Sequence, residues 1–420
     1  MSAPRHVMIL GGGTGGTITA NRLRRTLPES MDITVVDSNN HHIYQPGLLF
    51  VPFGLAEPDH LIRPRDRQLH HGIEYMDAVV ESVDIAGSRV HFSGGRTAEY
   101  DVLVIATGAV LMPEETEGLD VSGARPNMFT FYSLDGARAL RDALATFTAG
   151  RIVVNVVDMP IKCPVAPLEF CFLADWFFRE RGIRDAVALT YVTPLDGAFT
   201  KPVASQRLGE LLAAKGIEVV TEFNTGTVDG DAGRLVSYDD REVPFDLAVV
   251  VPLHGGAAYV GRSDGLGDEL HFIPTDMQTL QSTVAPNVFV IGDAAGLPVS
   301  KAGSVTHFEG EVVTENIRRF LAGERLDASY DGHANCFIET GFGKAVLIDF
   351  NYDTEPLPGH YPGPVGLPLL RESHLNHLGK LMFEWVYWHL LLPGRDIPGV
   401  GSTMPRSGKR MVKTHQEVKA

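Results

Sequence analysis

The glycine loop at residues 11–16 constrains the fold of this chain more than any other feature of its 420 residues. It reads GGGTGG and lies between a short apolar run, His6–Leu10, and a stretch with helical spacing at 17–27. A second apolar run at 32–36 ends at Asp37, which lies 21 residues after Gly16. A strand, a glycine loop, a helix and a second strand in this order predict a dinucleotide-binding βαβ unit.

Each position of this loop has a physical task in such a unit. Gly11 permits the tight turn, Gly13 lets the backbone approach a pyrophosphate, and Gly16 lets the helix pack closely on the strand. The free N–H groups at the start of the helix then face the phosphates, and Asp37 can accept the ribose hydroxyls. A glycine-rich turn without a ligand is the alternative, and the complete βαβ context makes it the weaker interpretation.

Two later segments repeat the pattern of a buried strand that ends in small residues: DVLVIATGA at 101–109 and NVFVIGDAA at 287–295. Between them, apolar strands and helical stretches alternate at 151–157, 168–181, 186–192, 205–215 and 216–221. This order predicts an α/β fold with two Rossmann-like domains. The first is built from residues 1–112 and 251–325, and the second, degenerate one from 113–250. Residues 326–420 show an irregular pattern and form a C-terminal region with a helix at 374–392.

Composition limits the function classes. A net charge of −16 argues against a nucleic-acid partner, because phosphate binding needs a basic face. Three cysteines (Cys163, Cys171 and Cys336) are too few for a disulfide framework, and they lack the spacing of a zinc site, so we expect no metal. We see no signal peptide and no apolar run long enough to span a membrane.

The segments VIATGA at 104–109 and VFVIGDAAG at 288–296 resemble the second and third FAD-contact segments of the two-dinucleotide-domain flavoproteins. These include the relatives of glutathione reductase, the type II NADH dehydrogenases, flavocytochrome c sulfide dehydrogenase and sulfide:quinone oxidoreductase. The resemblance implies non-covalent FAD, since no cysteine lies near 44–46 to form the flavocytochrome's covalent link. The implied cofactor-binding residues are Gly11, Gly13, Gly16, Asp37, Val79, Ala106, Thr107, Gly108, Gly292, Asp293 and Lys301.

In that family the aspartate at the position of Asp293 hydrogen-bonds the ribityl chain. Lys301 resembles a lysine at the pyrimidine edge of the flavin, where it stabilises the reduced, anionic ring. The alternative for Lys301 is a surface lysine at the start of a helix. Family members that use NAD(P)H carry a second glycine loop, whereas this chain has no glycine between Gly150 and Gly182. We therefore predict no nicotinamide site, which argues against an NADH dehydrogenase.

The segment KCPVAPLE, from Lys162 to Glu169, resembles the Cys-Pro-Pro-x-Pro-x-Glu segment of flavocytochrome c sulfide dehydrogenase and related sulfide:quinone oxidoreductases. Cys336 and Phe337 resemble the later cysteine segment. The two cysteines are 173 residues apart (336 − 163), and in the family they meet beside the flavin as a disulfide or a chain of sulfur atoms. Two buried structural cysteines are the alternative. Lys162 is expected on the face opposite to Cys163 if the preceding strand continues.

The resemblance assigns proton transfer to Glu169, although a glutamate favoured by the helix dipole is an equal alternative. Cys171 lies on an apolar helix and is expected to be core. Many sulfide:quinone oxidoreductases have a further cysteine upstream, and the corresponding stretch here, 127–134, has none. The function that the resemblance implies is FAD-dependent oxidation of sulfide to polysulfide or sulfur through a Cys163–Cys336 redox bridge, with electrons passed to membrane quinone. The alternatives are a flavocytochrome-like sulfide dehydrogenase and a non-catalytic redox-sensing flavoprotein.

The helix at 374–392 predicts where the acceptor binds. Leu375, Leu378, Met382 and Trp385 form an apolar stripe, and His377, Lys380, Glu384 and Tyr387 form a second, polar one. An amphipathic helix with interfacial aromatic residues suits a membrane surface, so we expect a peripheral membrane protein and a possible homo-oligomer. Packing on the protein's own core is the alternative. Phe337 is the candidate for contact with the quinone ring, and Arg406, Lys409, Arg410 and Lys413 add positive charge that attracts anionic lipid.

Overall fold

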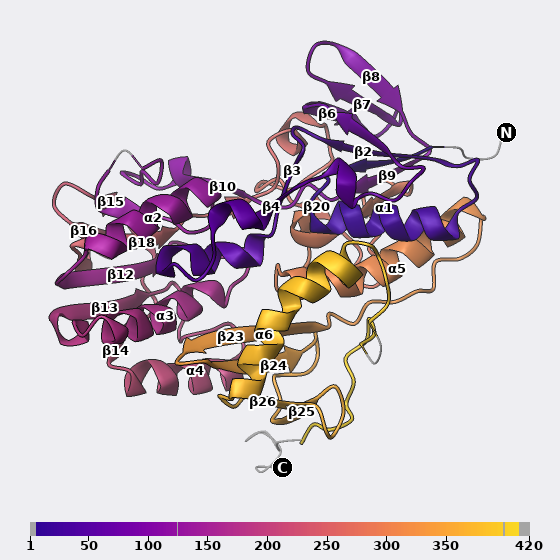
Figure 1. The fold of residues 1–420 in the computed structure, drawn as a ribbon. Helices are drawn as coiled ribbons and strands as arrows, with labels where there is room; N and C mark the ends of the chain where they lie inside the picture. Colours follow the sequence, from indigo (N-terminus) through magenta and orange to yellow (C-terminus); the bar gives the residue numbers. More distant parts are fainter. Residues whose placement is uncertain (1–5, 124, 398–399, 411–420) are drawn as a thin grey trace, which may run out of the picture.

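The computed structural model describes residues 6–123, 125–397 and 400–410, and it confirms the predicted α/β fold with two parallel sheets (Figure 1). The first sheet has the order β21–β9–β1–β2–β5, and each neighbouring pair is parallel. Its strands are β1 (His6–Leu10), β2 (Asp32–Asp37), β5 (Glu74–Asp77), β9 (Val102–Ile105) and β21 (Val288–Val290). The helices α1 (Thr14–Thr26) and α5 (Gly303–Leu321) lie against each other beside this sheet. An antiparallel sheet of β6 (Val80–Asp84), β7 (Arg89–Phe92) and β8 (Arg96–Glu99) is attached to it.

The second parallel sheet has the order β11–β18–β12–β13–β14. Its strands are β11 (Met128–Phe129), β12 (Gly150–Val156), β13 (Val187–Val192), β14 (Ile217–Val220) and β18 (Leu247–Val251). The helices α2 (Leu134–Thr146), α3 (Ala166–Glu180) and α4 (Pro202–Ala214) belong to this half, as does the antiparallel sheet β15 (Thr225–Asp229), β16 (Arg234–Ser237) and β17 (Glu242–Pro244). Two short strands in the segments that connect the halves, β10 (Val110–Leu111) and β19 (His254–Gly255), pair with each other in an antiparallel way.

The C-terminal region is more regular than its sequence indicates. Beyond residue 325 the structure forms a four-stranded sheet in the order β23–β24–β26–β25, with β23 (Ala334–Gly341), β24 (Lys344–Phe350), β25 (Gly359–Tyr361) and β26 (Leu367–Leu369). The irregular sequence pattern did not reveal these strands. All residues of β24 except Lys344 are buried, including Asp349, so the strand lacks the alternation of apolar and polar residues that marks a half-exposed strand.

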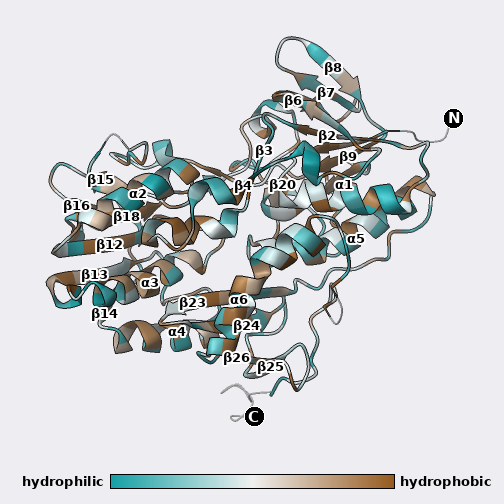
Figure 2. Cartoon of the chain, in the orientation of Figure 1, coloured by the Kyte–Doolittle hydropathy of each residue, from teal (hydrophilic) through white to brown (hydrophobic). Residues whose placement is uncertain are grey.

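The predicted C-terminal helix is α6 (His374–Val386), followed by a π-helical turn at Tyr387–Leu391. It runs from beside β24 towards α1 (Figure 1). The helix carries both apolar and polar residues (Figure 2). The apolar stripe faces outward, with side chains that are more than half exposed, whereas Lys380 and Tyr387 point into the protein. No helix in the described ranges is both long and apolar enough to cross a membrane.

Candidate active site

The predicted site residues, Gly16 excepted, line one cavity of about 630 Å³. Its walls come from the glycine loop, from the carboxyl ends of β2, β9 and β21, from the loop before α3, from β23 and from α6. Parallel sheets bind ligands at the carboxyl ends of their strands, so the position follows from the topology. The volume lies within the range of about 300–1,000 Å³ that is typical of small-molecule and cofactor sites.

The glycine loop closes one end of this cavity. A Cβ at Gly16 would lie 1.8 Å from the carbonyl oxygen of Gly11, and one at Gly11 would lie 2.4 Å from that of Ala106, so neither position accepts a side chain. A Cβ at Gly13, in contrast, meets no heavy atom of the described residues within 4 Å. The backbone is therefore tightly packed at Gly11 and Gly16 and open to the cavity at Gly13. Gly13 also precedes α1, and no described side chain caps the start of that helix, so its N–H groups are available to a ligand.

Asp37 lies at the end of β2 and holds the loop from the other side. Its carboxylate accepts a hydrogen bond of 2.8 Å from the backbone N–H of Gly12 and pairs with the guanidinium of Arg65. Burial lowers the pKa of Arg65, whose side chain is 9% exposed. Arg65 lines the cavity too, and the sequence analysis missed it, because nothing around residue 65 identifies it as the partner of an aspartate 28 positions earlier.

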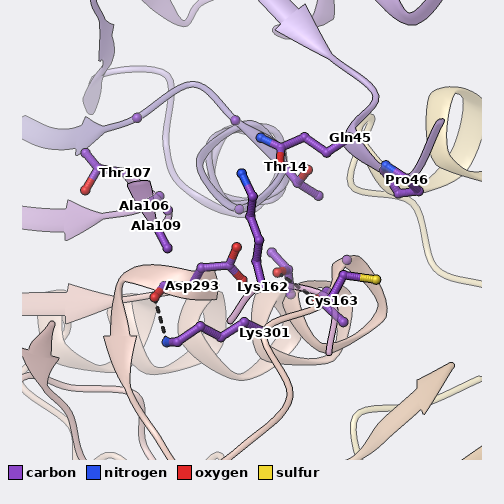
Figure 3. A pocket seen from close by; sticks show the side chains of 18 of the residues that line it. Thr14, Gln45, Pro46, Ala106, Thr107, Ala109, Lys162, Cys163, Asp293 and Lys301 are labelled. Carbon is purple, nitrogen blue, oxygen red and sulfur yellow. Dashed lines mark hydrogen bonds between the residues drawn. The ribbon is translucent and has the colours of Figure 1, made fainter. Parts of the chain in front are cut away.

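Asp293 and Lys301 form the opposite wall (Figure 3). Lys301 is 7% exposed, and its Nζ donates to the carbonyl oxygens of Asp293 at 2.7 Å and of Ala295 at 3.0 Å. The alternative of a surface lysine is thereby excluded. Burial raises the pKa of the Asp293 carboxyl, and the nearby Lys301 opposes that rise.

Cys163 and Cys336 both line the cavity although they come from different domains. Cys163 lies in the loop before α3 with a positive φ of 48°, a conformation that is rare for a residue with a side chain. Three hydrogen bonds hold its backbone there. Its N–H donates to the carbonyl of Lys301 at 2.6 Å, and its carbonyl accepts from the N–H of Ala166 at 2.9 Å and from the hydroxyl of Tyr132 at 3.1 Å. Cys336 is in β23 and is 8% exposed. All three cysteines carry free thiols, and Cys171 is buried in the core on α3.

The environment of the pair disfavours free thiolates. Burial raises the pKa of Cys163 to about 12; Glu169 adds to that rise and Lys380 opposes it. Burial also raises the pKa of Cys336, to which the neighbouring Cys163 and Glu169 contribute. Lys380 is a cation that lowers the pKa of both thiols.

Glu169 and Lys380 form a buried ion pair beside the cysteines. The side chains are 2% and 13% exposed, and Glu169 also accepts a hydrogen bond of 2.6 Å from the backbone N–H of Glu339. Burial raises the pKa of Glu169, which Lys380 and that hydrogen bond partly reverse. Lys380 donates a second hydrogen bond of 3.1 Å to the carbonyl of Phe337. The sequence analysis put Lys380 on the polar stripe of the C-terminal helix but did not recognise that this stripe faces the site.

Lys162 lies on the same side of the structure as Cys163. The expectation that it points away assumed a continuing strand, but β12 ends at Val156, and both residues line the cavity. The Lys162 side chain extends into it (Figure 3). Burial lowers the pKa of Lys162, and the acidic groups Asp293 and Cys163 oppose that shift. Lys162 is therefore a further cation of the site, which the assumption of a continuing strand placed on the wrong face.

The residues present fit FAD. The three dinucleotide motifs meet at one cavity, Gly13 leaves room where a pyrophosphate approaches, and the free start of α1 faces that space. Val79 and Ala106–Gly108 line the walls between Asp37 and Asp293. The loop at 158–164, which carries no glycine, follows β12 at the position of a second phosphate-binding loop, and Glu169 lies in the first turn of the next helix. The absence of a nicotinamide site stays a prediction.

Comparisons with known proteins point to the same family. The family model described as pyridine nucleotide-disulphide oxidoreductase matches residues 5–155. The mitochondrial sulfide:quinone oxidoreductase of Mus musculus is 26% identical over 395 residues, which cover 92% of this chain and 86% of the mouse protein. The sulfide-quinone reductase of Aquifex aeolicus is 26% identical over 308 residues, covering 70% of this chain and 69% of that protein.

Among solved structures, the sulfide:quinone oxidoreductase of Aquifex aeolicus aligns with a TM-score of 0.79 at 20% identity, over 93% of this chain and 92% of that one. This likeness extends beyond the two parallel sheets to the C-terminal region. The resemblance to the sulfide:quinone oxidoreductases is thereby confirmed, and with it the prediction of an FAD-binding oxidoreductase.

Proposed function

We propose that this protein oxidises sulfide through the Cys163–Cys336 pair and passes the electrons by way of non-covalently bound FAD to a membrane quinone. One observation carries the proposal: two cysteines 173 residues apart (336 − 163) line the same cavity as three dinucleotide motifs. The relatives that match nearly the whole chain are named sulfide:quinone oxidoreductases, which supports the same reaction.

The reaction begins on an oxidised pair joined by an S–S bond. Hydrosulfide forms a bond to one Sγ, the S–S bond breaks, and the products are a persulfide on one cysteine and a thiolate on the other. Sulfur thereby loses two electrons, which are held on the thiolate. FAD, when bound, accepts electrons in pairs and can pass them to a quinone. Reoxidation joins the outer sulfur of the persulfide to the freed Sγ, so the bridge keeps the added sulfur atom and releases two electrons and the proton of hydrosulfide. These two electrons, that proton and one proton from solvent convert the quinone to the quinol.

The charges around the pair support this sequence. A lone thiolate is disfavoured in this buried setting, since the pKa of Cys163 is raised to about 12. Lys380 is the cation that counteracts burial at both thiols, so it stabilises the thiolate when it forms. Glu169 has a raised pKa and lies next to both, which suits it to take the proton of hydrosulfide and to release it towards the quinone.

The quinone is proposed to bind on the side of the cavity formed by Phe337 and α6. Phe337, Phe383 and Phe50 line it, and Lys380 lies 5.4 Å from the ring centroid of Phe50. Flat aromatic faces suit a quinone ring. Lys380 then lies between the cysteines and the aromatic residues, within reach of both half-reactions.

The outward face of α6 supports docking at a membrane. Leu375, Leu378, Leu381, Met382 and Trp385 are 54–63% exposed, and such a cluster of large apolar side chains on one helix marks a contact surface. The predicted basic contribution of the tail is smaller than expected: the side chain of Lys409 is 2% exposed and pairs with Asp349, and Lys413 lies outside the described residues. We propose a peripheral membrane protein whose docking helix forms one wall of the quinone site.

Anaerobic mixing of the FAD-loaded protein with sulfide tests the proposal. We expect prompt bleaching of the flavin absorbance, which a short-chain quinone reverses. Cys163→Ser and Cys336→Ser should abolish bleaching, whereas Cys171→Ser, at the third cysteine, is the matched control and should preserve it. Bleaching by NADH and not by sulfide would revive the NADH dehydrogenase. No response to either would favour the non-catalytic flavoprotein.

A further inference from the structure

The end of the C-terminal helix reaches the glycine loop through a chain of buried hydroxyl and imidazole groups. Tyr387 is 1% exposed, lines the cavity, and its hydroxyl lies 2.7 Å from Oγ1 of Thr14 and 2.7 Å from Nε2 of His42. The Nδ1 of His42 lies 3.2 Å from the carbonyl oxygen of Gly12. The chain Thr14–Tyr387–His42–Gly12 thus contacts the loop on both sides of Gly13, the position open to the dinucleotide.

The hydrogen bonds of this chain have one consistent direction. A carbonyl only accepts, so Nδ1 of His42 must donate to Gly12. Burial lowers the pKa of His42 to about 4, so the ring is neutral and its Nε2 accepts. Tyr387 therefore donates to His42, and Thr14 donates to Tyr387. The chain fixes the tautomer of His42 and the rotamer of Thr14 together.

A second set of contacts holds the segment after Tyr387 on α1. Asn21 donates a hydrogen bond of 2.7 Å to the carbonyl of Leu392, and Arg25 donates one of 3.0 Å to that of Gly394. The ring of Tyr387 also packs 4.8 Å from that of Tyr44, another cavity residue. The turn that carries Tyr387 is π-helical, a local irregularity that is frequent at functional sites.

We propose that Tyr387 is a positioning residue of the FAD site, through which the C-terminal helix holds the glycine loop in its binding conformation. FAD binding and the docking of residues 387–394 on α1 are then linked, because each stabilises the state that the other requires. The loop receives from the C-terminal region the preorganisation that a rigid site needs. This inference does not depend on the substrate.

The test compares FAD release from diluted holoenzyme, followed by the fluorescence of the free flavin. Tyr387→Phe removes only the hydroxyl, and with it the bonds to Thr14 and His42. It should raise the dissociation constant of FAD about three- to tenfold, the order of effect of buried hydrogen bonds. Tyr330→Phe is the matched control, since Tyr330 is also 1% exposed and donates a bond of 2.7 Å to the carbonyl of His333, away from the cavity. It should leave the affinity within twofold of the parent.

Two further readouts separate positioning from a general structural role. Thr14→Val should weaken FAD binding. In the double variant with Tyr387→Phe, the dissociation constant should rise by less than the product of the two single effects, because both changes break the bond between Thr14 and Tyr387. Amide hydrogen exchange of residues 387–394 should be slower in FAD-saturated than in FAD-depleted protein, and Tyr387→Phe should shrink that difference. The proposal would be overturned if Tyr387→Phe bound FAD as tightly as the parent, or if Tyr330→Phe lost as much FAD affinity as Tyr387→Phe. It would also be overturned if the effects of Thr14→Val and Tyr387→Phe on the dissociation constant multiplied in the double variant.

Discussion

Removing the cation of the buried pair, by Lys380→Met, should destabilise the protein far more than the loss of a surface ion pair. Met keeps most of the volume of the lysine side chain, so the change is one of charge. Glu169 is 2% exposed and would keep the amide of Glu339 as a donor but lose its counter-ion. Breaking a buried pair costs about 3–5 kcal/mol. We expect a value near the lower end, about 3 kcal/mol, because the side chain of Lys380 is 13% exposed and water replaces part of the interaction.

The free energy of unfolding is measured by denaturant titration of the FAD-saturated protein, with unchanged slopes as the condition for comparison. Burial already raises the pKa of Glu169, and removing Lys380 raises it further. The folded variant then binds a proton that the unfolded chain, with a glutamate pKa of about 4.3, releases. Its stability should therefore fall as the pH rises from about 4.3, the pKa of the unfolded glutamate, towards the raised pKa of the folded variant.

The control is the double variant Lys380→Met with Glu169→Gln, which removes both charges. It should recover a large part of the lost stability and show no such fall with pH. A loss below about 1 kcal/mol in the single variant, as for an exposed pair, would refute the reasoning. So would a stability of the single variant that does not change across this pH range.

The remaining predictions concern the loop and the docking helix. Gly16→Ala should fail to load FAD and lose stability, since its methyl group would lie 1.8 Å from a carbonyl oxygen; Gly13→Ala should fold normally yet bind FAD weakly, because its methyl group meets only the space of the dinucleotide. Measurements of FAD content and of the unfolding midpoint distinguish the two variants. If Gly16→Ala bound FAD weakly but kept its stability, the conclusion that a side chain at position 16 clashes with the loop would be wrong. Met382→Glu should weaken binding to anionic lipid vesicles about tenfold or more, since a large apolar side chain contributes roughly 1.5–3 kcal/mol on leaving water. Val365→Glu, at a 99% exposed residue outside α6, should have no effect in the same sedimentation assay, and equal effects of both would argue against docking through α6.

Much of the fold could be predicted because its signals are local. Glycines at 11 and 16 mark close backbone approaches that a side chain would block, Gly13 marks the position open to the ligand, and buried parallel strands are short apolar runs wherever they occur. The C-terminal hairpin of β23 and β24 escaped notice for the related reason that a strand buried on both faces has no alternation to detect.

The sequence by itself determined the dinucleotide fold and the FAD motifs, and it predicted the two cysteines of the site, since each of these signals depends on residues that are neighbours along the chain. Only the tertiary structure decided which charges serve the site. Lys380 pairs with a glutamate 211 positions earlier, Arg65 with Asp37, and Tyr387 reaches Thr14 across 373 positions. Helical periodicity separates an apolar from a polar stripe on α6, but it does not say which stripe faces the protein. That choice belongs to long-range packing, which here turns His377 and Lys380 of the polar stripe inward, where Glu339 and Glu169 pair with them.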